Sequence, residues 1–224
     1  MISLRDYICE AKKLDPAHEA VVEKVYKEIE KLNGGDVKVT YSVAGSGKSS
    51  SLSMTLIDKS LKDGFAGKLK VSLSFERGNL VMYVPIISMV KDDKFIYLND
   101  TQITSLCPTW KPSFNAVKKG SGRMATYIVA PADYNKLTNA LSKLPDQFKG
   151  FSMFTTIVSN FEKYKEQAED LAAAAMAKPM DRKAFLKEFP ESTDGYRNAV
   201  VPRMSDIIID DISKTAAKDL KKLM

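Results

Sequence analysis

The chain has 224 residues, of which 44% are hydrophobic and 28% charged, and its formal net charge is +6. This length and composition are typical of a folded globular protein and exclude a disordered one. No apolar run approaches the ~20 residues of a membrane helix, and no charged leader precedes an apolar stretch at the N-terminus. The two cysteines, Cys9 and Cys107, are far apart in sequence, as expected of free thiols in a reducing compartment. We therefore expect a cytoplasmic protein with no membrane partner.

The positive charge is unevenly distributed along the chain. Residues 1–35 have 6 basic and 7 acidic side chains, and residues 131–224 have 15 and 14. Residues 36–130 have 13 basic and 7 acidic side chains, so this block alone accounts for a net charge of +6. A concentrated basic surface attracts polyanions, chiefly nucleic acid or an anionic membrane face, although many unrelated domains carry as much charge for solubility.

Two helices are predicted before this basic block. A short helix begins at Ser3, with Asp6 three residues later in a capping-box position. A second helix begins at Asp15-Pro16, where the aspartate is the N-cap and the proline takes the first helical position. Gly34-Gly35 ends the second helix, because glycine accepts the left-handed conformation found at helix C-termini.

Residues 36–130 change to the two-residue period of β-strands. Val37–Val43 and Lys68–Phe75 alternate apolar and polar side chains, as half-buried strands do. Leu80–Ile87 is apolar on both faces, which indicates a central strand. Further short strands are predicted at Leu52–Leu56, Phe95–Leu98 and Met124–Ala130, whereas residues 99–123 show no period.

The helical pattern returns at Pro131. A stripe of apolar side chains, mostly phenylalanines, follows at spacings of three and four residues: Phe148, Phe151, Phe154, Val158 and Phe161. Asp181 caps a short helix that stops at Pro190, and residues 190–204 are loop-like. A last amphipathic helix is predicted from Ser205 to Leu223.

Strands that follow one another through short turns build antiparallel sheets, because parallel strands need a crossover helix between them. The predicted fold class is therefore α+β, in a single domain of residues 1–224. Helices over residues 1–35 and 131–224 flank a central antiparallel sheet of four to six strands in residues 36–130, and they cover one face of it.

The pattern of basic and aromatic side chains in the sheet block suits a nucleic-acid-binding protein rather than an enzyme. Lysines project from the polar phase of the strands, and residues 99–123 mix cations with aromatic rings. Unpaired bases stack on aromatic rings while lysine and arginine follow the phosphates, so we expect binding to single-stranded DNA or RNA with little sequence preference. The candidate residues are Lys38, Lys48, Lys68, Lys70, Trp110, Lys111, Phe114, Lys118, Lys119 and Arg123. In the alternative, Trp110 and Phe114 fill the edge of the core and the lysines are merely solvated.

One short motif favours a nucleotide-binding protein instead. Residues 42–49 resemble the P-loop of nucleoside triphosphatases, with Gly47, Lys48 and Ser49 matching its G-K-[ST] end and Ser42 replacing its first glycine. Residues 207–211, Ile-Ile-Ile-Asp-Asp, resemble the apolar strand and aspartate that bind Mg²⁺ in such enzymes. The alternation of residues 37–43 and the lack of crossover helices oppose this interpretation, which leaves a Gly/Ser hairpin loop as the alternative.

Other enzyme classes and cofactors have less support. The single histidine, His18, argues against a Ser-His-Asp triad, and with two separated cysteines it cannot complete a zinc site. We therefore expect no catalytic residues, no metal and no cofactor. A third class is a structural protein that forms homo-oligomers, or binds a protein partner, through the phenylalanine stripe and the C-terminal helices.

Overall fold

The computed structural model describes residues 16–43, 49–76, 78–92, 95–96, 111–121 and 125–221. The predicted helix that begins at Ser3 lies outside these residues. The strands are β1 (Val37–Val43), β2 (Ser49–Asp58), β3 (Phe65–Glu76), β4 (Asn79–Tyr83), β5 (Ile86–Lys91), β6 (Phe95–Ile96), β7 (Ala116–Lys119) and β8 (Thr126–Val129). The helices are α2 (Pro16–Glu30), the 3-10 turn η3 (Pro131–Asp133), α4 (Tyr134–Phe148), α5 (Ser152–Ala174), α6 (Arg182–Glu188) and α7 (Asp194–Leu220).

The strands form one sheet in the order β1-β2-β3-β4-β8-β7, with β5 beside β3 and β6 beside β5. Every pairing between the described strands is antiparallel. The α+β class and the antiparallel sheet are therefore confirmed. Among the described residues the sheet has eight strands rather than four to six, because β7 forms inside the segment without a period and the strand predicted over Leu80–Ile87 is divided into β4 and β5.

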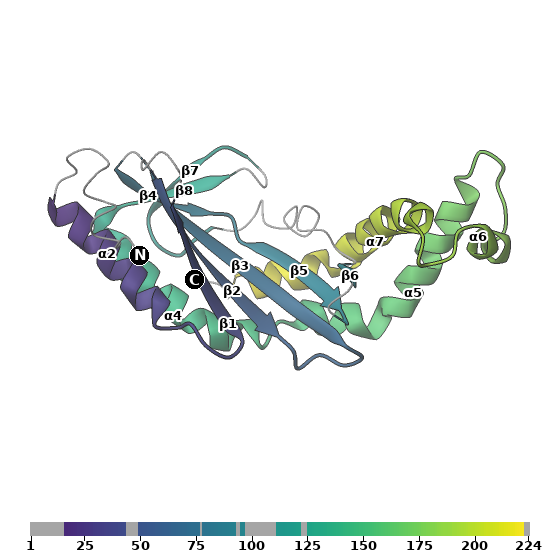
Figure 1. Cartoon of the computed structure of the whole chain (residues 1–224), viewed down its shortest axis with the longest axis horizontal. Coiled ribbons are helices and arrows are strands. Elements are labelled where there is room, and N and C mark those ends of the chain that lie inside the picture. The colour runs from purple at the N-terminus through teal and green to yellow at the C-terminus, as the bar shows by residue number, and fades with distance from the viewer. Residues whose placement is uncertain are drawn as a thin grey trace.

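One face of the sheet, here called the inner face, packs against helices. The apolar phase of the central strands points to it, so that Leu52, Leu73 and Met82 lie opposite one another on β2, β3 and β4. All three side chains are buried. α2 reaches this face through Tyr26, whose ring lies 6.1 Å from that of Tyr41 on β1, and α4 packs on α2 and β2. α2 and α4 lie side by side along the sheet (Figure 1).

The C-terminal helices extend the molecule beyond the sheet. α5 and α7 run antiparallel as a helical hairpin, since the start of α5 contacts the end of α7 through Ser152 and Asp219. The tip of this hairpin and α6 project past the end of β3 and β5 (Figure 1). The sequence predicts that the terminal helices cover one face of the sheet. α2 and α4 do so, but only part of the hairpin of α5 and α7 does.

The hairpin joins the sheet through close aromatic packing. The rings of Phe65 on β3 and Phe161 on α5 lie 4.8 Å apart, and the Lys91 ammonium is 5.2 Å and 5.0 Å from their centres. A Cβ atom at Gly67 would lie 2.7 Å from the Phe154 ring, so only glycine permits this approach of β3 to α5. The four phenylalanines of the stripe are thus buried in the chain's own core, and Val158 packs partly buried against it.

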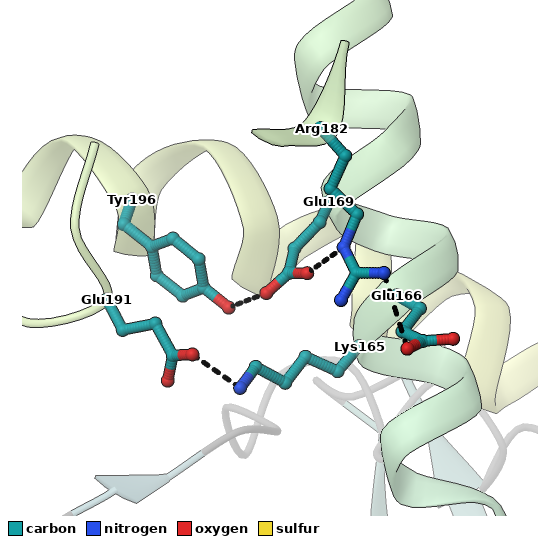
Figure 2. A network of polar contacts seen from close by, with 6 residues as sticks. All are labelled: Lys165, Glu166, Glu169, Arg182, Glu191 and Tyr196. Atoms are coloured by element: carbon teal, nitrogen blue, oxygen red, sulfur yellow. Dashed lines mark hydrogen bonds and ion pairs between the residues drawn. The ribbon is translucent and has the colours of Figure 1, made fainter. Parts of the chain in front are cut away.

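Polar contacts fix the tip of the hairpin (Figure 2). Glu169 on α5 is completely buried, and its two carboxylate oxygens accept hydrogen bonds from Arg182 Nε at 2.6 Å and the Tyr196 hydroxyl at 2.7 Å. Lys165 on α5 pairs with Glu191 at 2.6 Å, and Arg182 also pairs with Glu166 at 3.3 Å. These contacts hold α5, α6 and α7 together through charged and polar groups rather than through apolar packing.

The predicted loop over residues 190–204 is wrong. Only its first residues are irregular, because the Thr193 side chain caps α7 by accepting a hydrogen bond from the Tyr196 N–H. α7 then continues through Pro202, whose missing N–H would ordinarily interrupt a helix. Val200 and Met204 are buried on either side of this proline, so packing of the helix against its neighbours outweighs the local cost.

Candidate nucleic-acid interface

The outer face of the sheet, opposite the inner face, carries the polar phase of the strands. Lys38 on β1 lies opposite Thr55 on β2, and Thr55 lies opposite Lys70 on β3, so the two lysines share one row across three strands. At ~4.8 Å between strands, their backbones are about 10 Å apart. Lys68 lies on the same face, two residues along β3 from Lys70. Alternation in the sequence therefore predicted correctly that these three lysines share a face.

Hydroxyl groups occupy the positions between and beside these lysines. The hydroxyl oxygens of Ser42 and Ser51 are hydrogen-bonded at 2.7 Å across β1 and β2, and those of Ser53 and Ser72 at 3.1 Å across β2 and β3. The exposed or half-exposed polar side chains of this area, here called the hydroxyl–lysine patch, are Lys38, Thr40, Ser42, Ser51, Ser53, Thr55, Lys68, Lys70 and Ser72. Each hydroxyl can donate as well as accept a hydrogen bond, as contacts with phosphate and sugar oxygens require.

The patch does not cover the whole outer face. Toward β5 the face is closed to solvent, since Ala66, Ser88 and Val90 are buried. Toward β7 it carries the apolar Val117, which is 64% exposed, beside the single lysine Lys119. The accessible polar surface of the described strands is therefore concentrated on β1, β2 and the middle of β3.

An aromatic side chain lies beside the patch. Tyr83, the last residue of β4, is 37% exposed on the outer face. Its hydroxyl donates a hydrogen bond to Glu76 at 2.9 Å, and the Ser74 hydroxyl donates to the same carboxylate oxygen at 2.6 Å. Burial raises the pKa of the Tyr83 hydroxyl above its ordinary value, and the hydrogen bond to Glu76 raises it further. Glu76 is the only carboxylate among the described strand residues of this face.

The remaining predicted residues are not gathered with the patch. Lys119 lies on the outer face but on β7, and Lys118 next to it lies on the inner side of the same strand, opposite Tyr127. Both are exposed, as is Lys111 in the segment before β7. Phe114 is only 6% exposed and belongs to the hydrophobic core, so the prediction that bases stack on it is wrong. Lys48, Trp110 and Arg123 lie outside the described residues.

The P-loop interpretation fails at Ser49. In a P-loop the Gly-Lys-Ser sequence opens a helix whose N-terminus holds the phosphates. Ser49 instead begins β2, which pairs antiparallel with β1. Gly47 and Lys48 themselves lie outside the described residues. The sequence proposed as the Mg²⁺-binding strand, residues 207–211, is part of α7.

The described part of the chain contains no group of three or more histidine, cysteine, aspartate or glutamate side chains that could hold a metal ion. Among the same residues, no helix has the length and apolar character needed to cross a membrane. Comparison with protein families, with curated proteins and with solved structures finds no match for this chain.

Sequence reasoning missed Tyr83. The segment Leu80–Ile87 was interpreted as apolar on both faces, and a tyrosine in such a strand reads as a core residue. The sequence does indicate that Tyr83 lies on the outer face. Leu80 and Met82 alternate with Val81 and Tyr83, so Tyr83 points away from the face on which Leu80 and Met82 are buried.

Proposed function

We propose that the protein binds single-stranded nucleic acid through the hydroxyl–lysine patch, with little sequence preference and without catalysis. The observation that carries this proposal is the grouping of three lysines and six hydroxyl side chains on one solvent-facing area of three neighbouring strands. Lysines neutralise phosphates, and hydroxyls add hydrogen bonds to phosphate and sugar oxygens that carry no sequence information.

The charge around the patch supports the same proposal. Lys38, Lys68 and Lys70 form no ion pair within the described chain. Their charges are therefore available to a ligand. Glu76, the one carboxylate of this face within the described strands, lies at the end of β3 beyond Ser72 and Ser74.

The direct test is fluorescence anisotropy with a labelled deoxythymidine oligonucleotide across a range of salt concentrations. Binding of the wild type should weaken steeply as salt rises, because each neutralised phosphate releases counterions. The double variant Lys38→Ala, Lys70→Ala should bind more weakly, and its plot of log affinity against log salt should be shallower by about 1.4, or ~0.7 for each lost phosphate contact.

A matched double variant controls for net charge. Lys163 on α5 and Lys187 on α6 are exposed lysines on helices, outside the strands that carry the patch. Lys163→Ala, Lys187→Ala removes the same charge and should leave the salt slope near that of the wild type. Equal effects of the two double variants, or no binding by the wild type at low salt, would show that the patch is not the binding surface.

A further inference from the structure

Tyr83 occupies an irregular point in the sheet. Lys70 pairs with Ile86 and Leu73 pairs with Met82, so the two residues of β3 between Lys70 and Leu73 face three residues, 83–85. Such an extra residue is a β-bulge, which turns a side chain away from the regular pleat and is common beside functional sites. The break is compatible with the sheet because Pro85 has no N–H to donate, and the Val84 N–H donates to the Ala125 carbonyl at 3.3 Å.

The neighbours of Tyr83 leave its ring accessible. Thr126 lies opposite it on β8, and Ser72 is next to it across β3 by the register of the two strands. Neither is a large apolar residue, and 37% of Tyr83 remains exposed. The hydrogen bond from its hydroxyl to Glu76 holds the ring at one end, which limits the entropy lost when a planar group stacks on it.

Charge orients a ligand across this area. Lys70 lies two residues along β3 from Ser72, on the side of Tyr83 away from Glu76. A phosphate is attracted to the lysines and repelled by the Glu76 carboxylate, whereas an uncharged base is not repelled. A strand whose phosphates follow Lys38 and Lys70 can therefore direct a base toward the tyrosine.

We infer that Tyr83 is a stacking platform for an unpaired base, so that the outer face recognises single strands in preference to duplexes. This inference rests on the proposed function of the hydroxyl–lysine patch and adds the group that distinguishes exposed bases from bare phosphates. Bases inside a duplex are already stacked on each other and present no free face to a tyrosine on the sheet surface.

The test compares two ligands and three variants in the anisotropy assay. The ligands are a deoxythymidine oligonucleotide and a chain of the same length in which every nucleotide is abasic. Tyr83→Ala should bind the deoxythymidine strand at least about tenfold more weakly than the wild type does, because it loses the ring on which a base stacks. Its affinity for the abasic chain should equal that of the wild type, because that chain has no base to stack. Tyr83→Phe retains the ring and should bind both ligands nearly as the wild type does.

Tyr41→Ala is the matched control. Tyr41 is 41% exposed, similar to Tyr83, but lies on the inner face opposite Leu52, so its removal should not change affinity for either ligand. Equal loss for both ligands in Tyr83→Ala, or equal loss in Tyr83→Phe and Tyr83→Ala, would overturn the stacking inference while leaving the proposed function intact. Failure of the wild type to bind either ligand at low salt would overturn both.

Discussion

Glu169 is a fully buried carboxylate of the hairpin. Removing a charge from water costs several kcal/mol, and the cost is recovered only where the charge is paired and its oxygens accept hydrogen bonds. Glu169 meets both conditions through Arg182 and Tyr196 (Figure 2). The network therefore stabilises the packing of α6 and the start of α7 on α5 only while all three partners are present.

Arg182→Ala should destabilise the protein by about 3 kcal/mol, because it leaves Glu169 buried without a compensating charge. The change is read from the midpoint of urea unfolding. Lys165→Ala is the control, since its partner Glu191 is 53% exposed and an ion pair with such a partner contributes less than about 1 kcal/mol. If both variants lose the same stability, Glu169 is solvated in solution and the argument from its burial is wrong.

In the helical hairpin, a residue near the end of α7 caps the start of α5. α5 begins after Phe151, which has no side chain able to cap the free N–H groups of the first turn. Asp219, near the end of α7, supplies the missing acceptor, with its carboxylate 2.8 Å from the Met153 N–H and 3.1 Å from the Ser152 hydroxyl. Its negative charge also lies at the positive end of the helix dipole of α5.

Asp219→Ala should therefore destabilise the protein by about 2 kcal/mol, because it removes a cap inside the structure, where water cannot easily replace it. Asp219→Asn retains an acceptor oxygen and should lose less. Asp181→Ala provides a comparison, since Asp181 caps the exposed start of α6 within its own segment, at 2.8 Å from the Ala184 N–H, and should lose about 1 kcal/mol. Urea unfolding of the three variants gives the order, and a smaller loss for Asp219→Ala than for Asp181→Ala would contradict it.

The elements that the sequence predicted well are those with strong local periodicity. The alternation in β1 and β3 placed Lys38, Lys68 and Lys70 on one face, and the cap at Asp181 was correct. β7 has no alternation to detect, since Val117 is exposed and the strand exists because it pairs with β8. The alternation of residues 80–83 indicates the face on which Tyr83 lies, but its place beside the lysines depends on the pairing of three strands and on a bulge between two of them.

At the scale of the whole molecule, three buried tyrosines make the stability of the core depend on pH. Tyr26 on α2, Tyr134 on α4 and Tyr164 on α5 are all at most 2% exposed. Burial raises the pKa of each of these hydroxyls, and in Tyr164 the hydrogen bond that its hydroxyl donates to Asp211 adds to the effect and brings the pKa to about 12. The three residues belong to different helices, so an ionisation at any of them charges a different part of the packed core.

These raised values predict a loss of stability in alkaline solution. In the unfolded chain a tyrosine has a pKa near 10, so between about pH 10 and pH 12 the unfolded state releases protons that the folded state retains. The free energy of unfolding must then fall as pH rises, by about 1.4 kcal/mol per pH unit for each fully displaced tyrosine, whereas these groups have no effect below about pH 9.

Urea unfolding of the wild type from pH 8 to pH 11 measures this slope, and Tyr164→Phe provides the internal control. The variant loses the hydrogen bond to Asp211, an exposed residue, so at pH 8 it should be less stable by about 1 kcal/mol. Above pH 10 it lacks one of the titrating groups, so its stability should fall less steeply than that of the wild type and the two curves should converge. Parallel curves over this range would show that the Tyr164 hydroxyl ionises equally in the folded and unfolded states, and that its site in the core is open to water.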